Sequence, residues 1–154
     1  MWRLKNDLVH LSIALGALVA GAALEEMLPK FAHAGFPFLL MAAVFFASRR
    51  KRGEALMFAV AAGAVEDALS SLPFATSIAF FALVAAFVHT TQITRVTYIF
   101  VYPVYELWMR MWTSALEGDV FSRFLVAMPV GAVTALAAVG ALAWLDGKGA
   151  VDVD

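Results

Sequence analysis

The stretch from Gly63 to Ser77, GAVEDALSSLPFATS, lies between two strongly apolar segments. It indicates a corner at which one helix ends and the next begins. The residue before a proline disfavours α-helical geometry, so a helix arriving from the N-terminal side should end before Pro73. Thr76 or Ser77 can then cap the following helix, because a hydroxyl oxygen can accept a hydrogen bond from a free backbone N–H. Ser70 adds another polar group at this helix end.

The composition of the whole chain indicates what kind of helices meet at this corner. Of 154 residues, 63% are hydrophobic and 15% are charged, and the mean hydropathy is +0.84. Soluble domains typically have about 45–50% apolar and about 25% charged residues. Lipid can solvate the apolar surface that a single core of this size cannot bury. The chain is therefore predicted to be an all-α, polytopic protein of the lipid bilayer.

A membrane-spanning helix needs roughly 20 apolar residues, and six segments approach this length. The links between them are short, so a single transmembrane domain is expected over residues 1–145. Residues 146–154 are predicted to form a short, disordered cytoplasmic tail. The six predicted spans cover residues 8–24, 31–48, 54–72, 76–93, 96–116 and 121–145.

Lys and Arg residues predict the orientation, because they concentrate in the cytoplasmic loops of membrane proteins. The strongest signal is the basic loop formed by Arg49, Arg50, Lys51 and Arg52. With the N-terminus inside, most other Lys and Arg residues also fall on the inner side. Both termini are therefore predicted to be cytoplasmic.

Two adjacent acids, Glu66 and Asp67, interrupt the third predicted span. If this span begins near Glu54, Glu66 lies roughly 18 Å along it, in the outer half of a hydrocarbon core about 30 Å thick. A carboxylate at that depth needs a partner, water or a proton. Three interpretations follow: a polar cluster that fixes the corner, a helix end that reaches water, or a site of transport chemistry.

A second charged pair, Glu106 and Arg110, lies in the fifth predicted span. The four-residue spacing, with Glu first, favours an ion pair within one helix. A bridge from Arg110 to Asp67 or Glu66 is the alternative, because Arg110 should lie at a similar depth. Pro103 is expected to kink or loosen this helix and to free a backbone carbonyl.

The remaining polar residues do not predict catalysis, a cofactor or a metal. His10, His33 and His89 fall in different predicted segments without a metal-binding spacing. The chain has no Cys, which excludes disulfides, thiol catalysis and Cys-ligated metals, and its net charge of −1 gives no overall attraction to nucleic acid. A protein that is not an enzyme is expected.

Residues 37–87 resemble the MreD family of bacterial rod-shape-determining membrane proteins. The resemblance is carried by Pro37, by the basic loop ending at Gly53, and by Gly63 and Asp67 in a G-x-x-x-D spacing followed by Ser70 and the Leu72-Pro73 corner. Glu106 is similar in placement to an acid of that family's fifth span. The turn departs from the family pattern, because Leu72-Pro73-Phe74-Ala75 lacks the usual glycine.

This resemblance implies a non-enzymatic scaffold subunit of the bacterial cell-elongation machinery, which synthesises peptidoglycan, located in the plasma (inner) membrane. It implies the partner MreC, together with MreB, RodA and the RodA-associated transpeptidase. It also implies a fold like that of the substrate-binding subunits of energy-coupling-factor transporters. The alternative function is therefore a substrate-binding membrane subunit for a vitamin, with a cavity that uses Glu66, Trp108 and Trp112. A weaker third interpretation is a proton or ion conduit through Glu106 and Asp67.

Overall fold

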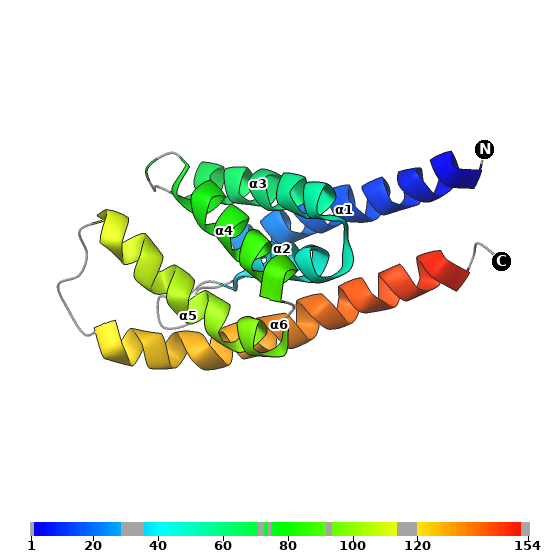
Figure 1. Cartoon of the computed structure of the whole chain (residues 1–154). Helices are drawn as coiled ribbons and strands as arrows, with labels where there is room; N and C mark the ends of the chain where they lie inside the picture. The colour runs from blue at the N-terminus through cyan, green and yellow to red at the C-terminus, as the bar shows by residue number, and fades with distance from the viewer. Residues whose placement is uncertain are drawn as a thin grey trace.

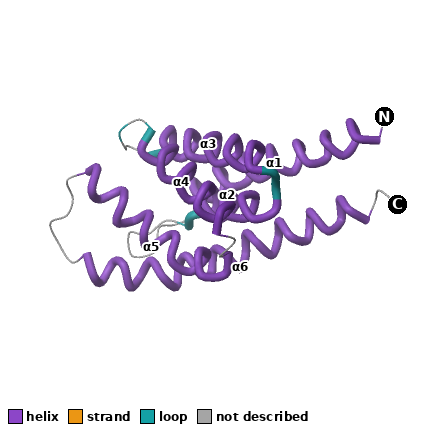
Figure 2. Tube along the Cα trace, viewed as in Figure 1, coloured by secondary structure: helices purple, strands orange, loops and turns teal. Residues whose placement is uncertain are grey.

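The computed structural model describes residues 2–28, 36–70, 73, 75–91, 94–113 and 120–151. Over these ranges the chain is entirely helical apart from short turns, and they contain no strand (Figure 2). The prediction of an all-α protein with six helical segments is confirmed. The helices are α1 (Trp2–Met27), α2 (Phe38–Arg49), α3 (Arg52–Leu69), α4 (Thr76–Thr91), α5 (Thr94–Thr113) and α6 (Val120–Val151).

The helix α2 forms the centre of the bundle. Every residue from Leu39 to Ala47 is buried, which agrees with a helix that is apolar on all its faces. It contacts each of the other five helices. With 12 residues it is about 18 Å long, so it is shorter than the second predicted span, whose residues 31–35 lie outside the described part of the chain.

The other helices are arranged around α2 in an elongated bundle (Figure 1). The most extensive packing joins α3 to α4 and α5 to α6. The start of α1 and the end of α6 lie at the same end of the molecule and extend beyond the other helices. The end of α3, the end of α5 and the start of α6 lie at the opposite end. The molecule therefore has two distinct ends, one with both termini and one with the corner.

Two of the described helices are long and apolar enough to cross a membrane, namely α1 within His10–Met27 and α6 within Leu125–Gly147. The helices α2 and α4 are apolar but shorter. The six expected helices are therefore present. Among the described residues, two of these helices have the length and composition of a membrane span.

The end of α6 differs from its prediction. Residues 146–151 continue the helix to Val151, although a disordered tail was expected to begin at Asp146. The Asp146 carboxylate forms ion pairs with Arg49 and Arg50, and these contacts fix this part of α6 to the end of α2. Pro103 and Pro129 both lie inside helices that continue past them.

Candidate functional site: a capped corner and an acidic cavity

The side chain of Asp67 caps the helix that follows the corner. Its Oδ1 atom accepts a hydrogen bond of 2.8 Å from the backbone N–H of Ser77, and Oδ2 lies 3.5 Å from the N–H of Ile78. These two residues lie in the first turn of α4, where backbone N–H groups lack partners within the helix. A carboxylate there also interacts favourably with the helix dipole. Asp67 at the end of α3 therefore fixes the start of α4.

Gly63 lies one turn before Asp67 and lets the two helices approach. A Cβ atom at Gly63 would lie 2.6 Å from the Ile78 Cα and 2.7 Å from the Ile78 backbone nitrogen. Those atoms belong to the main chain and cannot rotate away. The four-residue spacing places Gly63 and Asp67 on the same face of α3. The G-x-x-x-D pattern thus combines close backbone contact with a cap.

Two aromatic residues of α5 hold the same helix start. The Ser77 hydroxyl and the Tyr105 hydroxyl are buried and lie 2.7 Å apart in a hydrogen bond. The indole N–H of Trp108 donates to the Thr76 carbonyl over 3.0 Å. The Thr76 hydroxyl instead donates to the Pro73 carbonyl over 2.7 Å. The prediction that Thr76 or Ser77 would cap α4 is therefore wrong, because Asp67 provides the cap.

Ala75 shows how the corner closes without the expected glycine. Its φ angle is 70°, in the left-handed region that favours glycine. At this turn an alanine therefore adopts the left-handed conformation, at a cost of about 1–2 kcal/mol.

The corner between α1 and α2 uses the same construction. Glu25, near the end of α1, accepts a hydrogen bond of 2.8 Å from the backbone N–H of Leu39, in the first turn of α2. A Cβ atom at Gly21 would lie 2.9 Å from the Leu39 Cδ2 atom. An acid therefore caps the next helix, and a glycine one turn earlier contacts the capped residue, in both the α1–α2 and α3–α4 pairs.

This repetition is visible in the sequence but was not predicted. Residues 21–25 read GAALE and residues 63–67 read GAVED, so each begins with Gly-Ala and ends with an acid. No capping role was predicted for Glu25. The repeated spacing from glycine to acid is the signal that could have identified its capping role.

Between the two corners lies a cavity of about 230 Å³, which we call the acidic cavity. Four carboxyl groups line it, from Glu25 and Glu26 on α1, Glu66 on α3 and Glu106 on α5. The buried Tyr102 and Tyr105 also line it. The structure thus brings the predicted residues Glu66 and Glu106 into one site and adds Glu25 and Glu26.

Contacts inside the acidic cavity orient its acids. The Glu66 and Glu25 carboxyl groups lie close enough to interact with each other. Tyr102 hydrogen-bonds to Glu106, one turn along α5. Ser70 lines the cavity too, and its buried Oγ atom has no hydrogen-bond partner in the described part of the chain. These groups could bind a ligand that donates hydrogen bonds or carries positive charge.

Two predicted arrangements, an ion pair of Arg110 and a cavity lined by Trp108 and Trp112, are not present among the described residues. Arg110 is only 9% exposed, but the ion pairs among described residues join it neither to Glu106 nor to Asp67 or Glu66. Glu106 instead contacts Tyr102, and Asp67 is engaged by α4. Trp108 and Trp112 stack near each other, with ring centroids 5.8 Å apart, but neither lines the acidic cavity. No metal-binding group of His, Asp and Glu occurs among the described residues.

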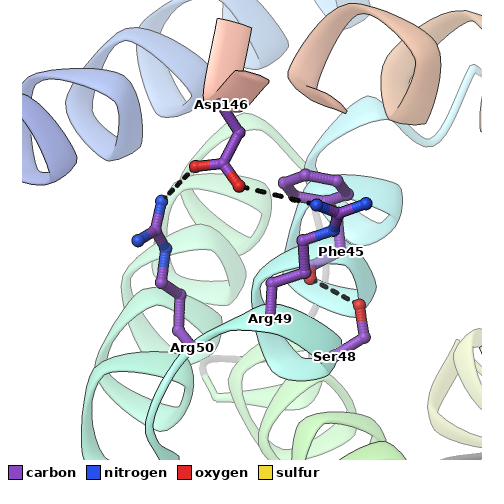
Figure 3. Close-up of polar contacts among 5 residues, drawn as sticks. All are labelled: Phe45, Ser48, Arg49, Arg50 and Asp146. Atoms are coloured by element: carbon purple, nitrogen blue, oxygen red, sulfur yellow. Dashed lines mark hydrogen bonds and ion pairs between the residues drawn. The ribbon is translucent and has the colours of Figure 1, made fainter. Parts of the chain in front are cut away.

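The basic loop lies at the end of the molecule that carries both termini. Arg50 donates to Asp146 of α6 over 2.5 Å, and Arg49 lies 3.7 Å from the same carboxylate (Figure 3). The Arg49 guanidinium also lies 5.1 Å from the centre of the Phe45 ring. These contacts connect the end of α6 to the α2–α3 turn. Lys51 and Arg52 are exposed beside them.

Comparison of the chain with protein-family models, with curated proteins and with solved structures finds no match.

Proposed function

We propose that this protein is a non-enzymatic scaffold subunit of the bacterial cell-elongation machinery, related to MreD and binding MreC. Its location would be the plasma (inner) membrane, with both termini in the cytoplasm. The proposal also places it beside MreB, RodA and the RodA-associated transpeptidase.

The observation that carries this proposal is the use of Asp67. It is the acid of the G-x-x-x-D motif on which the resemblance rests, and both its oxygens face backbone N–H groups of α4. Gly63, the other end of the motif, contacts the backbone of the same helix. A motif that builds a corner supports a structural role better than a chemical one.

The two ends of the bundle support the proposed orientation. The basic loop and the end of α6 are joined through Asp146, so the most basic segment and the C-terminal helix end lie on one side. The end of α3, which carries Asp67, lies at the opposite end of the bundle (Figure 1). This separation of charge agrees with a cytoplasmic side that carries most Lys and Arg residues.

Capture of MreC tests the proposal. A tagged chain should retain MreC from the same organism after co-expression and purification in mild detergent. Replacing Gly63 with Leu should reduce the captured MreC per folded chain, because the corner can no longer close. Gly16→Leu is the matched control, because a Cβ atom at Gly16 meets no atom within 4 Å. A stably folded wild-type chain that captures no MreC would refute the proposal.

A second candidate is the substrate-binding subunit of a small-molecule (vitamin) transporter. The acidic cavity favours it, because four carboxyl groups and two tyrosines surround about 230 Å³. Mass spectrometry of the purified chain should then detect a co-purified small molecule with hydrogen-bond donors or positive charge. Glu66→Gln should lower its occupancy, whereas Glu54→Gln at the other end of α3 should not. An empty preparation that no basic solute stabilises against heat would exclude this candidate.

A further inference from the structure

A second cavity opens as an apolar groove between α1 and α3, near the basic loop. It has a volume of about 460 Å³. His10, Arg50 and Glu54 line it at one end, whereas Leu18 and Ala61 line it at the other. The groove therefore has one charged end and one apolar end.

The groove follows the two helices from the charged end inward. It extends along α1 from His10 to Leu18, eight residues further on, and along α3 from Glu54 to Ala61, seven residues further on. At about 1.5 Å per residue, this is roughly 10–12 Å along the helices. A lipid acyl chain, which is narrower than a helix, can lie along a groove of this length.

The charged end has an excess of positive charge. Arg50 and Glu54 line this end, and Arg49, Lys51 and Arg52 are the neighbours of Arg50 in the basic loop. Among the described side chains, the carboxylates that lie by these basic residues are Glu54 and Asp146. Asp146 engages Arg49 and Arg50, whereas Lys51 and Arg52 are exposed and form no ion pair with a described residue. A ligand with a negative group would complement this end of the groove.

His10 gives an independent indication of a ligand. Its Nδ1 atom is buried beside the groove and has no hydrogen-bond partner in the described part of the chain. Buried polar atoms are rarely left without a partner. A phosphate or ester oxygen at the charged end would supply one.

We propose that the groove binds one anionic phospholipid of the cytoplasmic leaflet. Its phosphate would lie against Lys51, Arg52 and His10, and one acyl chain would follow α1 and α3 into the bilayer. The cytoplasmic membrane surface attracts basic segments because its lipids are anionic. This inference rests on the membrane placement in the proposed function but not on the binding of MreC.

Native mass spectrometry in detergent tests the proposal with two lipids that have identical acyl chains. Phosphatidylglycerol should bind as a single molecule at least 10-fold more tightly than phosphatidylcholine. Lys51→Gln combined with Arg52→Gln should weaken phosphatidylglycerol binding about 10- to 30-fold, since two basic residues near the headgroup are removed. Lys51→Arg combined with Arg52→Lys preserves both charges and should retain the binding. Glu54→Gln should strengthen it.

A variant of the apolar end tests the acyl-chain part separately. Ala61→Phe should fill the groove and abolish the single tightly bound lipid, whereas Val60→Phe places the same ring on an exposed neighbour and should not. Ala14→Leu from α1 serves the same purpose if Ala61→Phe does not fold.

Equal binding of the two lipids would overturn the proposal, as would lipid binding that survives both groove variants. A protein dimer that Ala61→Phe dissociates would overturn it too, because a second copy would then occupy the groove. A negative lipid result together with normal MreC capture would reject this inference alone.

Discussion

At the scale of single residues, the α1–α2 and α3–α4 corners each depend on a carboxylate that binds backbone N–H groups rather than a cation. Asp67 and Glu25 each accept a hydrogen bond from an N–H in the first turn of the following helix. Such N–H groups have no partner within their own helix, so each needs an acceptor from elsewhere in the molecule. The two carboxylates thus accept hydrogen bonds from backbone N–H groups that would otherwise be costly to bury.

Replacing Asp67 should therefore destabilise the fold in a graded way. Asp67→Ala removes the cap and should lower the free energy of unfolding by about 0.5–2 kcal/mol. Asp67→Asn keeps one acceptor oxygen and should cost less, because it loses mainly the charge–dipole interaction, about 0.3–1 kcal/mol. Thermal unfolding in detergent measures both variants. Equal losses for the two, or no loss for either, would contradict the capping role.

A substitution at Ala75 should instead stabilise the fold. Because its φ angle of 70° is unfavourable for an L-residue with a Cβ atom, Ala75→Gly should raise the free energy of unfolding by up to about 1 kcal/mol. The gain is partly offset by the greater freedom of glycine in the unfolded chain. Ala79→Gly, inside α4, is the control and should lower stability by about 1 kcal/mol. A melting temperature that falls with Ala75→Gly would refute the strained-turn interpretation.

At the scale of helices, close packing requires glycine at one position of each corner. The Gly63 position faces the main chain of α4, whereas the Gly21 position faces the movable side chain of Leu39. A methyl group should therefore be tolerated much less well at Gly63 than at Gly21.

Alanine substitutions measure this difference directly. Gly63→Ala should reduce the free energy of unfolding by about 1–3 kcal/mol through overpacking, although alanine favours helices by up to about 1 kcal/mol. Gly21→Ala should cost less, since Leu39 can shift. Gly16→Ala, which meets no neighbour, should be neutral or stabilising. The same order should appear in denaturation by heat or SDS, and a tolerated Gly63→Ala would contradict the close approach.

The contact between the basic loop and α6 can be tested in the same manner. Arg50 and Asp146 are mostly buried, with side chains 14% and 17% exposed. A double-mutant cycle with Arg50→Gln and Asp146→Asn should give a coupling energy of roughly 0.5–3 kcal/mol. Asp146→Asn should also broaden the distribution of distances between spin labels at residues 53 and 147. Additive effects with an unchanged distance would show that this contact does not hold α6.

At the scale of the whole molecule, the sequence predicted the number of helices and most of their ends. Ser70 and Pro73 predicted that α3 ends before the corner, as it does at Leu69. The length of the apolar segments predicted the ends of α4 and α5 to within a few residues. The partners of the acids were not predictable, because hydropathy and spacing along one helix do not show which other helix lies opposite. Spacing along α5 favoured a pair between Arg110 and Glu106, and depth alone suggested the alternative bridge to Asp67 or Glu66. The repeated GAALE and GAVED segments are a pattern along the chain that does indicate two similar corners. The continuation of α6 depends on Arg50, which is 96 residues away along the chain.

Both the scaffold proposal and the lipid proposal depend on one claim, that the corner end and the basic end lie on opposite sides of a membrane. The chain contains no Cys, so single cysteines can report the side of each end. Lys51, Pro73 and Gly147 are exposed and suit this purpose.

The decisive measurement is labelling of these single-Cys variants with a membrane-impermeant maleimide in spheroplasts. Pro73→Cys should react in intact spheroplasts, whereas Lys51→Cys and Gly147→Cys should react only after the membrane is permeabilised. Labelling of all three in intact spheroplasts, or protection of all three, would contradict the account.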